Sequence, residues 1–239
     1  MIKDLSYQNI NMIQFHFSEN EGYRLESSTL EALDGWKYPS DGYYTKEDML
    51  EIIAECQKYH IELVPSLDSP GHMTYVLSYL PDDWDCTSIW PSDWRSEQTF
   101  NIFEKEECRQ FLVDLFTEYA EFFSEAGCKH MNIGGDEFLN NFGSMTNDQY
   151  VTVMNYFNDI AALVKSYGLT PRAWNDGLLY KGYTDYKLDP DIEICYWSGP
   201  AQCATIADFV ENGNKVINYT DVYMYFALSS WWMNNANAN

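Results

Sequence analysis

The chain has 239 residues, of which 46% are hydrophobic and 21% charged, a composition typical of a globular protein with a sizeable core. Its 37 acidic and 14 basic residues give a formal net charge of −23, and a field of that sign repels nucleic acid and anionic membrane surfaces. We therefore expect no nucleic-acid partner and no membrane insertion. No stretch approaches transmembrane length, and the N-terminal MIKDLSYQNI lacks the anatomy of a signal peptide.

Apolar runs of strand length recur along the chain, with helical patterns between them. Helices are predicted over 45–60, 104–127 and 146–168, the first with Thr45 as its N-cap and the third starting similarly at Thr146. Continuously apolar strands that alternate with helices indicate a parallel sheet covered by helices. The predicted strands are 11–17, 61–67, 129–135, 169–175, 192–198 and 215–220.

Such a sheet is either doubly wound or closed into a (β/α)8 TIM barrel. No Gly-rich phosphate-binding fingerprint follows the first strand, which weakens the doubly wound, nucleotide-binding alternative. Polar or aromatic residues follow nearly every strand, and in a barrel these positions converge on the C-terminal face, where active sites lie. The sequence therefore predicts an α/β fold of the barrel class. The residues concerned are His16, Ser18, Arg24, Asp68, His72, Asp136, Glu137, Trp174, Asn175, Asp176, Tyr196, Trp197, Asn218, Tyr223 and Tyr225.

Six strands are two fewer than a closed barrel of this class contains. The first and eighth strands are neighbours in a barrel, so their absence would leave one contiguous gap with two unpaired edges. We therefore expect residues 1–239 to form a partial barrel, as a fragment or a truncated domain.

The cysteines are scattered, with no CxxC pair and no metal-ligand spacing. We expect them to be small buried residues or free thiols, and neither a disulfide framework nor a zinc site is indicated. They are Cys56, Cys86, Cys108, Cys128, Cys195 and Cys203.

The segment HMNIGGDEFLN, residues 130–140, places Asp136 and Glu137 side by side after a strand and two glycines. Gly134 and Gly135 let the backbone depart from regular strand geometry, so both acids can reach one cleft. Close carboxylates titrate as a coupled pair, and one of them is pushed to hold its proton near neutrality. Such a pair suits chemistry in which one acid donates a proton while the other stays charged, although adjacent acids are also common in solvated turns.

Ordinary two-carboxylate glycosidases need their acids on opposite sides of the scissile bond, roughly 5 to 9 Å apart and usually on different strands. Neighbours at one strand end serve poorly as an acid and an opposite-face nucleophile. If the chain is a glycosidase, we expect the nucleophile to come from elsewhere, such as from the substrate itself.

NIGGDEF resembles the acid-pair motif of the family 20 glycoside hydrolases, the β-N-acetylhexosaminidases and lacto-N-biosidases. Each motif is weak alone, but several follow one another in the order and spacing of this family, and the resemblance spans essentially the whole chain. The other segments are NMIQFHFSENEGYRLES, LVPSLDSPGHM, RAWNDG, CYW and VINYTDVYMYF.

The resemblance implies a retaining, exo-acting enzyme that hydrolyses terminal β-linked N-acetylglucosamine or N-acetylgalactosamine from glycans. In this family the 2-acetamido oxygen of the substrate attacks C1 and forms an oxazolinium intermediate. Glu137 would be the general acid and then the base, while Asp136 would stay ionised and accept the acetamido N–H. No metal or organic cofactor is implied, and the family suggests a location outside the cell or on its surface.

The same resemblance implies the residues that bind the sugar. Arg24 would bind hydroxyls of the terminal sugar, and His72 would tune the proton affinity of Glu137. The side chains expected around the acetamido group are those of Trp174, Trp197 and Tyr225, with Tyr223 as the alternative to Tyr225.

Several of these residues have simpler interpretations. Arg24 could form a surface ion pair with Glu19, Glu21 or Glu26, and Asp176 could be a helix N-cap. His72 could be a satisfied buried histidine and Trp197 part of the barrel packing, while His16 is expected to be structural.

The motifs also depart from the family pattern at supporting positions. Glu19 and Asn20 stand where adjacent aspartates are common, and Asn132 stands where many members have histidine.

Three alternatives to a monosaccharide-releasing enzyme stay open. The loop 73–103 has three tryptophans and could shape the larger pocket of a lacto-N-biosidase. An incomplete barrel could also be a sugar-binding remnant without turnover. A metal site built from Asp136, Glu137 and His16 is a third option, but no spacing of metal ligands in the sequence supports it.

Overall fold

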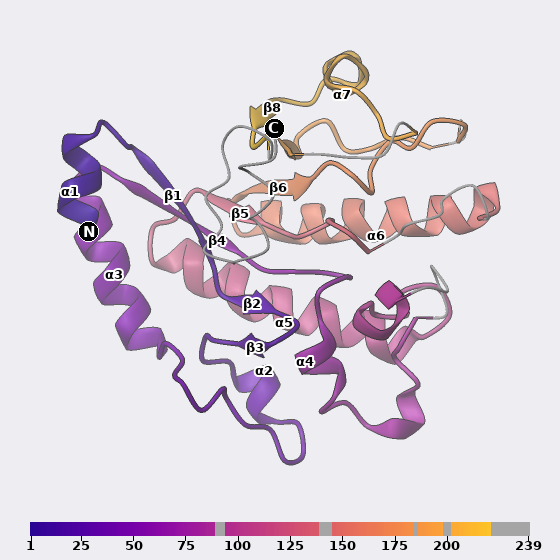
Figure 1. Ribbon diagram of the computed structural model, residues 1–239, viewed down its shortest axis with the longest axis horizontal. Helices are drawn as coiled ribbons and strands as arrows, with labels where there is room; N and C mark the ends of the chain where they lie inside the picture. Colours follow the sequence, from indigo (N-terminus) through magenta and orange to yellow (C-terminus); the bar gives the residue numbers. More distant parts are fainter. Residues whose placement is uncertain (89–93, 139–144, 184–185, 198–201, 221–239) are drawn as a thin grey trace, which may run out of the picture.

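The computed structural model describes residues 1–88, 94–138, 145–183, 186–197 and 202–220. Parallel strands form one curled sheet in the order β1-β4-β5-β6-β7-β8 (Figure 1). A short antiparallel pair, β2 (Ser18–Glu19) and β3 (Gly22–Tyr23), follows β1. The strands of the curled sheet are β1 (Met12–His16), β4 (Glu62–Ser66), β5 (His130–Asn132), β6 (Thr170–Trp174), β7 (Glu193–Tyr196) and β8 (Val216–Asn218).

The three predicted long helices are all present, and two of them begin at their predicted capping residues. Thr45 and Thr146 each accept a hydrogen bond from the backbone of the third helical residue, whose side chain bonds back, which satisfies N–H groups that a helix start leaves open. None of the helices within the described residues is long and apolar enough to cross a membrane. The α-helices are α1 (Ile2–Tyr7), α2 (Ser28–Glu31), α3 (Lys46–Lys58), α4 (Thr74–Leu77), α5 (Glu106–Glu125), α6 (Asn147–Ser166) and α7 (Ile206–Asn212), and the 3-10 helices are η1 (Asp82–Trp84) and η2 (Trp94–Gln98).

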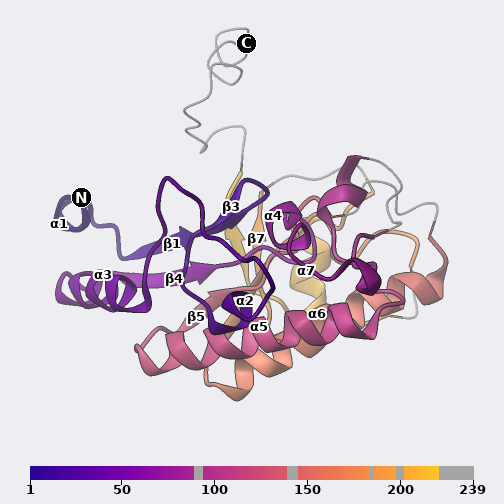
Figure 2. The same cartoon turned by 90° about the horizontal axis from the view of Figure 1, so that it is seen from below.

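The sheet curls into part of a barrel, with α3, α5 and α6 along its outer side (Figures 1 and 2). Every pair of neighbouring strands in this sheet is parallel, as in a (β/α)8 barrel. Among the described residues, β1 and β8 each pair with a strand on one side only. The prediction of an incomplete TIM barrel is therefore confirmed.

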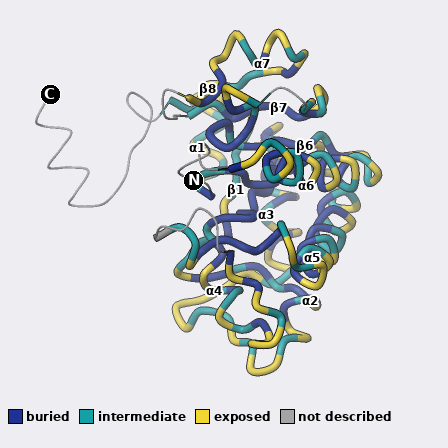
Figure 3. Tube along the Cα trace, turned by 90° about the vertical axis from the view of Figure 1, so that its right-hand side faces the viewer, coloured by how far each residue is buried: buried dark blue, intermediate teal, exposed yellow. Residues whose placement is uncertain are grey.

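The outer helices bury one apolar face each against the sheet (Figure 3). On α5 the fully buried side chains recur every three or four residues, which places them on one face of the helix. The same spacing on α6 brings Phe157 beneath the strand ends, where its ring lies 5.5 Å from that of Phe138. The buried residues of α5 are Cys108, Phe111, Leu112, Leu115, Phe116, Tyr119, Ala120 and Phe123.

Polar side chains on the inner side of the curl connect its two edges. The Tyr219 hydroxyl, just after β8, donates a 2.7 Å hydrogen bond to Oε1 of Gln14 on β1. Deeper in the barrel, Nε of Arg172 donates to Oε2 of Glu193 over 2.9 Å, and both side chains are buried. The first contact joins β1 to the residue after β8, and the second joins the neighbouring strands β6 and β7.

Cys86 and Cys108 form a disulfide, which corrects the expectation that no cysteine is paired. Their Cα atoms lie 5.6 Å apart, because Thr87 forms a β-bridge with Phe100 and so turns the long β4–α5 segment back toward the first turn of α5. The two residues are separated by 22 positions, a spacing that carries no local signal. The bond fastens the loop to a helix of the outer layer.

Glu118 on α5 connects this helix to two other helices by hydrogen bonds. Its carboxylate accepts hydrogen bonds from Ser27 Oγ, from the N–H groups of Ser28 and Thr29, and from Nζ of Lys46, all between 2.7 and 2.9 Å. Burial alone would raise the pKa of Glu118. The hydrogen bonds from Lys46 and from these backbone groups outweigh that effect and lower the pKa to about 2. One ionised side chain thus joins α5, the start of α2 and the start of α3.

We expect the Cys86→Ser/Cys108→Ser double variant to lose about 3 kcal/mol of unfolding free energy, because the unfolded chain is no longer constrained. Urea denaturation would measure it, with Cys128→Ser as the control, since that thiol is free. An unchanged midpoint in the double variant would show that the bond contributes nothing to stability.

Glu118→Gln should lower the free energy of unfolding at pH 7 by about 1.5–3 kcal/mol, the usual contribution of a hydrogen bond to a charged group. The pKa of Glu118 is lowered in the folded state, so its contribution is present above its ordinary value of 4.5 and is lost as the pH falls toward 2. The deficit of the variant should therefore shrink over this range in urea titrations. Glu121→Gln, on the exposed side of the same helix, should change little.

Candidate active site

Most of the predicted site residues that the structure describes meet at the C-terminal ends of the parallel strands. The sheet register sets His16 opposite Ser66, Ser66 opposite Asn132, and Trp174 opposite Cys195, so the strand ends lie at one rim of the barrel. His72 follows β4, Asp136 and Glu137 follow β5, Trp174 ends β6, and Trp197 follows β7. Tyr225 and its alternative Tyr223 lie outside the described residues.

The backbone after β5 turns so that both acids face the same side chain. Gly134 and Gly135 have φ of 83° and 102°, in the left-handed region, as predicted from their place before the acids. A Cβ on Gly134 would lie 2.4 Å from the backbone nitrogen of Ser69, so that site also requires glycine. Glu137 itself has φ of 46°, an uncommon conformation for a side-chain-bearing residue that recurs at functional sites.

Asp176 holds Glu137 in this conformation. Its Oδ2 accepts the backbone N–H of Glu137 over 2.9 Å, and its Oδ1 accepts Nε1–H of Trp197 over the same distance. The carboxyl group is buried, and no helix begins at Asp176 in the described chain, so the N-cap interpretation is wrong. Asp176 therefore positions both the acid and a tryptophan across three strand ends.

His72 lies between a supporting carboxylate and the acid pair. Its Nδ1 is 2.8 Å from Oε1 of Glu19, and its Nε2 is 3.7 Å from Oδ2 of Asp136 and 3.5 Å from Oε2 of Glu137. Burial alone would lower its pKa, but the contacts with Glu137 and Glu19 and the charge of Asp136 raise it to about 11. These contacts favour the charged form of His72. It is not a simple buried histidine.

The two acids have pKa values shifted in opposite directions. Burial and the nearby charge of Asp68 raise the pKa of Asp136 to about 8, against its ordinary value of 3.8. The contact with His72 lowers the pKa of Glu137, against the opposing effect of burial, and the charge of Arg95 lowers it further. In the unliganded site the proton therefore favours Asp136, which is the reverse of the distribution expected for a general acid at Glu137.

Arg95 is a site residue that the sequence analysis did not identify. Its Nη2 lies 3.3 Å from Oε1 of Glu137, and only 14% of its side chain is exposed. It belongs to η2 in the long β4–α5 segment. It is the only basic residue in the stretch 73–103, and this isolated charge beside several tryptophans is the signal that could have pointed to it.

Arg24 follows β3 directly and is held by an aspartate. Its Nη1 and Nη2 donate to the two carboxylate oxygens of Asp41 over 2.6 and 3.1 Å, and Nη1 also donates to the carbonyl of Gly42. The partner is thus none of the glutamates considered from the sequence. A guanidinium fork bound in this way keeps a fixed orientation, and none of these contacts joins Arg24 to the acid pair.

The two described tryptophans differ in their surroundings. Trp174 packs edge-on against Tyr219, with ring centroids 5.1 Å apart, and its Nε1 is buried without a hydrogen-bond partner among the described residues. Trp197 is bound at both its ring and its backbone, because Asn175 Oδ1 accepts its N–H over 2.8 Å. Its orientation is therefore fixed by the same strand end that positions Glu137.

His16 belongs to a polar cluster behind the acids. Its Nε2 lies 3.2 Å from Oδ2 of Asp68, which also accepts a hydrogen bond from Ser18. His16, Glu19 and Asp68 bring one ligand atom each within 4.8 Å of one another, the spacing a metal ion would need. These atoms are already occupied by each other and by His72, and neither Asp136 nor Glu137 belongs to the group.

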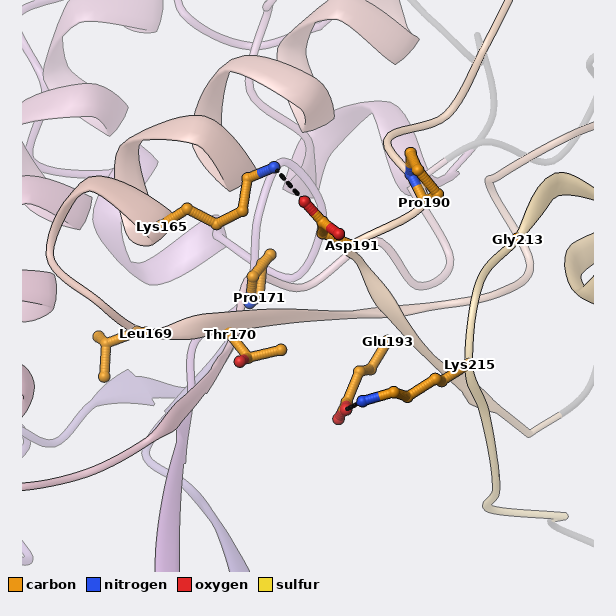
Figure 4. A pocket seen from close by; sticks show the side chains of 9 residues that line it. All are labelled: Lys165, Leu169, Thr170, Pro171, Pro190, Asp191, Glu193, Gly213 and Lys215. Atoms are coloured by element: carbon orange, nitrogen blue, oxygen red, sulfur yellow. Dashed lines mark hydrogen bonds and ion pairs between the residues drawn. The ribbon is translucent and has the colours of Figure 1, made fainter.

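A separate cavity of about 330 Å³ opens at the other end of the barrel, where β6, β7 and β8 begin (Figure 4). Its charged side chains neutralise one another: Lys165 binds Asp191 over 2.9 Å, and Lys215 binds Glu193 over 3.3 Å. This cavity is remote from the acid pair and is no part of the candidate active site.

A β/α barrel with neighbouring carboxylates and tryptophans at its C-terminal rim has the architecture of a barrel glycoside hydrolase. The chain belongs to glycoside hydrolase family 20, because residues 1–239 match the family described as "Glycosyl hydrolase family 20, catalytic domain".

Similar proteins carry names of two related kinds. The chain is 26% identical over 206 residues to a lacto-N-biosidase of Bifidobacterium bifidum, covering 79% of this chain and 17% of that protein. It is 24% identical over 239 residues to beta-hexosaminidase subunit A1 of Dictyostelium discoideum, covering 91% of this chain and 41% of that protein. The chain thus spans less than half the length of either curated relative.

Solved structures share the fold. Dispersin B superposes with a TM-score of 0.75 at 25% identity, covering 99% of this chain and 74% of that chain. The pneumococcal virulence factor StrH superposes with a TM-score of 0.76 at 24% identity, covering 91% of this chain and 59% of that chain.

Asp176→Ala should destabilise the protein by about 2–6 kcal/mol, because the N–H of Glu137 and the indole of Trp197 each lose a buried acceptor worth about 1–3 kcal/mol. Asp176→Asn keeps an acceptor oxygen for one of the two donors, so it should lose less. Urea denaturation followed by tryptophan fluorescence would report both stability and the surroundings of Trp197. Equal stability of Asp176→Ala and wild type would contradict this role.

Proposed function

We propose that the chain is the catalytic part of a retaining exo-β-N-acetylhexosaminidase, which removes terminal N-acetylglucosamine or N-acetylgalactosamine from glycans by substrate-assisted catalysis. The observation that carries the proposal is the placement of Asp136 and Glu137 at one strand end, both within 3.7 Å of Nε2 of His72. Acids that share one partner cannot flank a sugar ring from opposite faces, so neither serves as the opposite-face nucleophile. The acetamido group of the substrate takes that role.

In this mechanism the acetamido carbonyl oxygen attacks C1, the C1–O bond to the leaving group breaks, and its electron pair takes the proton of Glu137. Asp136 accepts the acetamido N–H and stabilises the positive charge of the oxazolinium ring. Glu137, now ionised, removes a proton from a water whose oxygen attacks C1, which opens the ring and restores the acetamide with net retention.

Substrate binding has to reverse the order of the pKa values of Asp136 and Glu137. A hydrogen bond donated by the acetamido N–H, together with developing positive charge, favours the ionised form of Asp136. Nε2 of His72, 3.7 Å and 3.5 Å from the two acids, offers a path by which the proton passes to Glu137 without changing the net charge of the site. Binding of an N-acetyl sugar would thus prepare the acid that cleaves it.

The remaining assignments come from the resemblance of the motifs to those of the family. Arg24, held by Asp41, would bind hydroxyls of the terminal sugar, and Trp174 and Trp197 would line the acetamido methyl group. Tyr225, or Tyr223, would donate to the acetamido oxygen. The partners are N-acetylhexosamine-containing glycans.

The disulfide between Cys86 and Cys108 supports a location outside the cell or on its surface, because such bonds persist in oxidising compartments.

A lacto-N-biosidase that releases a disaccharide by the same chemistry is the second candidate. It is favoured by the similarity to the B. bifidum protein of that name and by the long β4–α5 segment, whose Arg95 reaches the acid pair. Comparing p-nitrophenyl N-acetyl-β-glucosaminide with p-nitrophenyl lacto-N-bioside would separate the two candidates.

The test of the chemistry is hydrolysis of these aryl glycosides by wild type and Glu137→Gln. We expect Glu137→Gln to lose about 100- to 10,000-fold in kcat, the usual contribution of general acid–base catalysis. Glu121→Gln, on the outer face of α5, serves as the charge-matched control, and circular dichroism checks folding.

Full activity in Glu137→Gln would refute the assignment of the acid. A folded wild type that binds the sugar but turns over neither substrate would instead indicate a sugar-binding remnant.

A further inference from the structure

The 3-10 helix η2 contacts the site at two points. Arg95 at one end reaches Glu137, and Gln98 at the other end accepts a hydrogen bond from Asn20 Nδ2, whose amide also lies 3.3 Å from Nδ1 of His72. The short helix η2 therefore contacts Glu137 directly and contacts His72 through Asn20.

This element is held firmly by the surrounding fold. The N–H of Met73 donates to the carbonyl of Gln98 over 2.9 Å, and the hydroxyl of Thr99 donates to the carbonyl of Arg95 over 2.8 Å. Next to η2, the N–H of Phe100 donates to the carbonyl of Pro70 over 2.8 Å. Arg95 thus extends from a backbone whose position relative to His72 and Glu137 is set by several hydrogen bonds.

The carboxylate of Glu137 has a cation on each of its oxygens. Nη2 of Arg95 is 3.3 Å from Oε1, and Nε2 of His72 is 3.5 Å from Oε2. A carboxylate bracketed in this way is stabilised as an anion, whereas a general acid must carry a proton toward the glycosidic oxygen. One of the two cations must therefore leave its oxygen when the substrate binds.

Of the two, Arg95 is the cation that can leave. His72 has a short side chain whose Nδ1 is 2.8 Å from Oε1 of Glu19, on the side away from Glu137. Arg95 has a long side chain with a planar fork of donors, which can turn to another acceptor while its backbone stays in place.

We propose that Arg95 is a positioning and specificity residue: it orients Glu137 in the empty site, gives up its place at Oε1 to the glycosidic oxygen, and then binds oxygen atoms of the leaving-group sugar. This inference rests on the proposed function. It assigns a residue to the leaving-group sugar, which the acetamido pocket does not contact. The preferred leaving group is a sugar that presents a hydroxyl or anionic oxygen beside the linkage, in contrast to an aryl group.

The pH dependence of the reaction should report the same role. The charged groups that face Glu137 are His72 after β4, Arg95 on η2, Asp176 after β6 and its neighbour Asp136. Removing the positive charge of Arg95 raises the pKa of Glu137, so the acid keeps its proton to higher pH. The basic limb of kcat/KM should then move upward by about 1 pH unit.

The experiment compares two leaving groups on one donor sugar: N,N′-diacetylchitobiose and p-nitrophenyl N-acetyl-β-glucosaminide, or lacto-N-tetraose and p-nitrophenyl lacto-N-bioside if the donor is the disaccharide. Arg95→Met should lower kcat/KM for the oligosaccharide by about 10- to 100-fold, the size of one lost hydrogen bond to a charged group. The aryl glycoside should lose far less. A thiazoline analogue of the oxazolinium ion has no leaving group, so its affinity should not change.

Two further variants make the result specific to the position and shape of the side chain. Arg95→Lys keeps the charge but not the fork, so it should keep the wild-type pH profile and lose part of the preference for the oligosaccharide. Arg109→Met, which removes an arginine paired with Asp159 on the outer helices, should match wild type throughout.

Equal losses on both leaving groups with an unmoved pH profile would overturn the inference, because a merely structural role predicts that result. A wild type that hydrolyses neither substrate overturns the proposed function itself, and this is seen before any variant of Arg95 is made.

Discussion

The site is organised by several carboxylates that gather around one histidine. Glu19, Asp136 and Glu137 all lie within 3.7 Å of a nitrogen of His72, while Asp68 and Asp176 are buried beside them. Buried negative charges are costly unless protons or cations compensate them. Here His72 and the guanidinium of Arg95 lie against Glu137, and burial favours the protonated form of Asp136. A ligand that adds a hydrogen bond or a charge must redistribute that compensation, which connects binding to proton transfer.

The side chains that share this charge come from two kinds of scaffold. Asp136, Glu137, Asp176 and Trp197 stand at strand ends whose mutual positions are fixed by the parallel register of the sheet. Arg95 comes from a loop segment fastened by backbone hydrogen bonds and by the disulfide to α5. Strand ends suit groups that must keep one geometry for bond breaking, whereas a loop can differ between relatives and so suits contact with the varied remainder of a glycan.

Contacts around the rim hold two uncommon backbone conformations in place. Glu137 and His72 both adopt left-handed backbone conformations, and Gly134 approaches the backbone of Ser69 closely. Such conformations persist only where the surroundings overdetermine them. For Glu137 they are the hydrogen bond from its N–H to Asp176 and the packing of its neighbour Phe138 on Phe157 of α6. For His72 they include the contact with Glu19.

The sequence alone determined the features that depend on neighbours in the chain. Alternating strand and helix periods specified the parallel barrel, Thr45 and Thr146 marked helix starts, and the glycines before Asp136 and Glu137 indicated the turn that aims both acids into one cleft. These follow from backbone conformations that a few adjacent residues decide.

Only the tertiary structure decided which distant groups meet. Arg95 and Glu137 are 42 residues apart, Cys86 and Cys108 are 22 apart, and Asp41 reaches Arg24 across 17. The direction of the proton bias between Asp136 and Glu137 depends on burial and on charges contributed by other strands and loops. No local pattern carries that information, because electrostatic and covalent partners are selected by distance in space, which chain folding sets after the local structure is chosen.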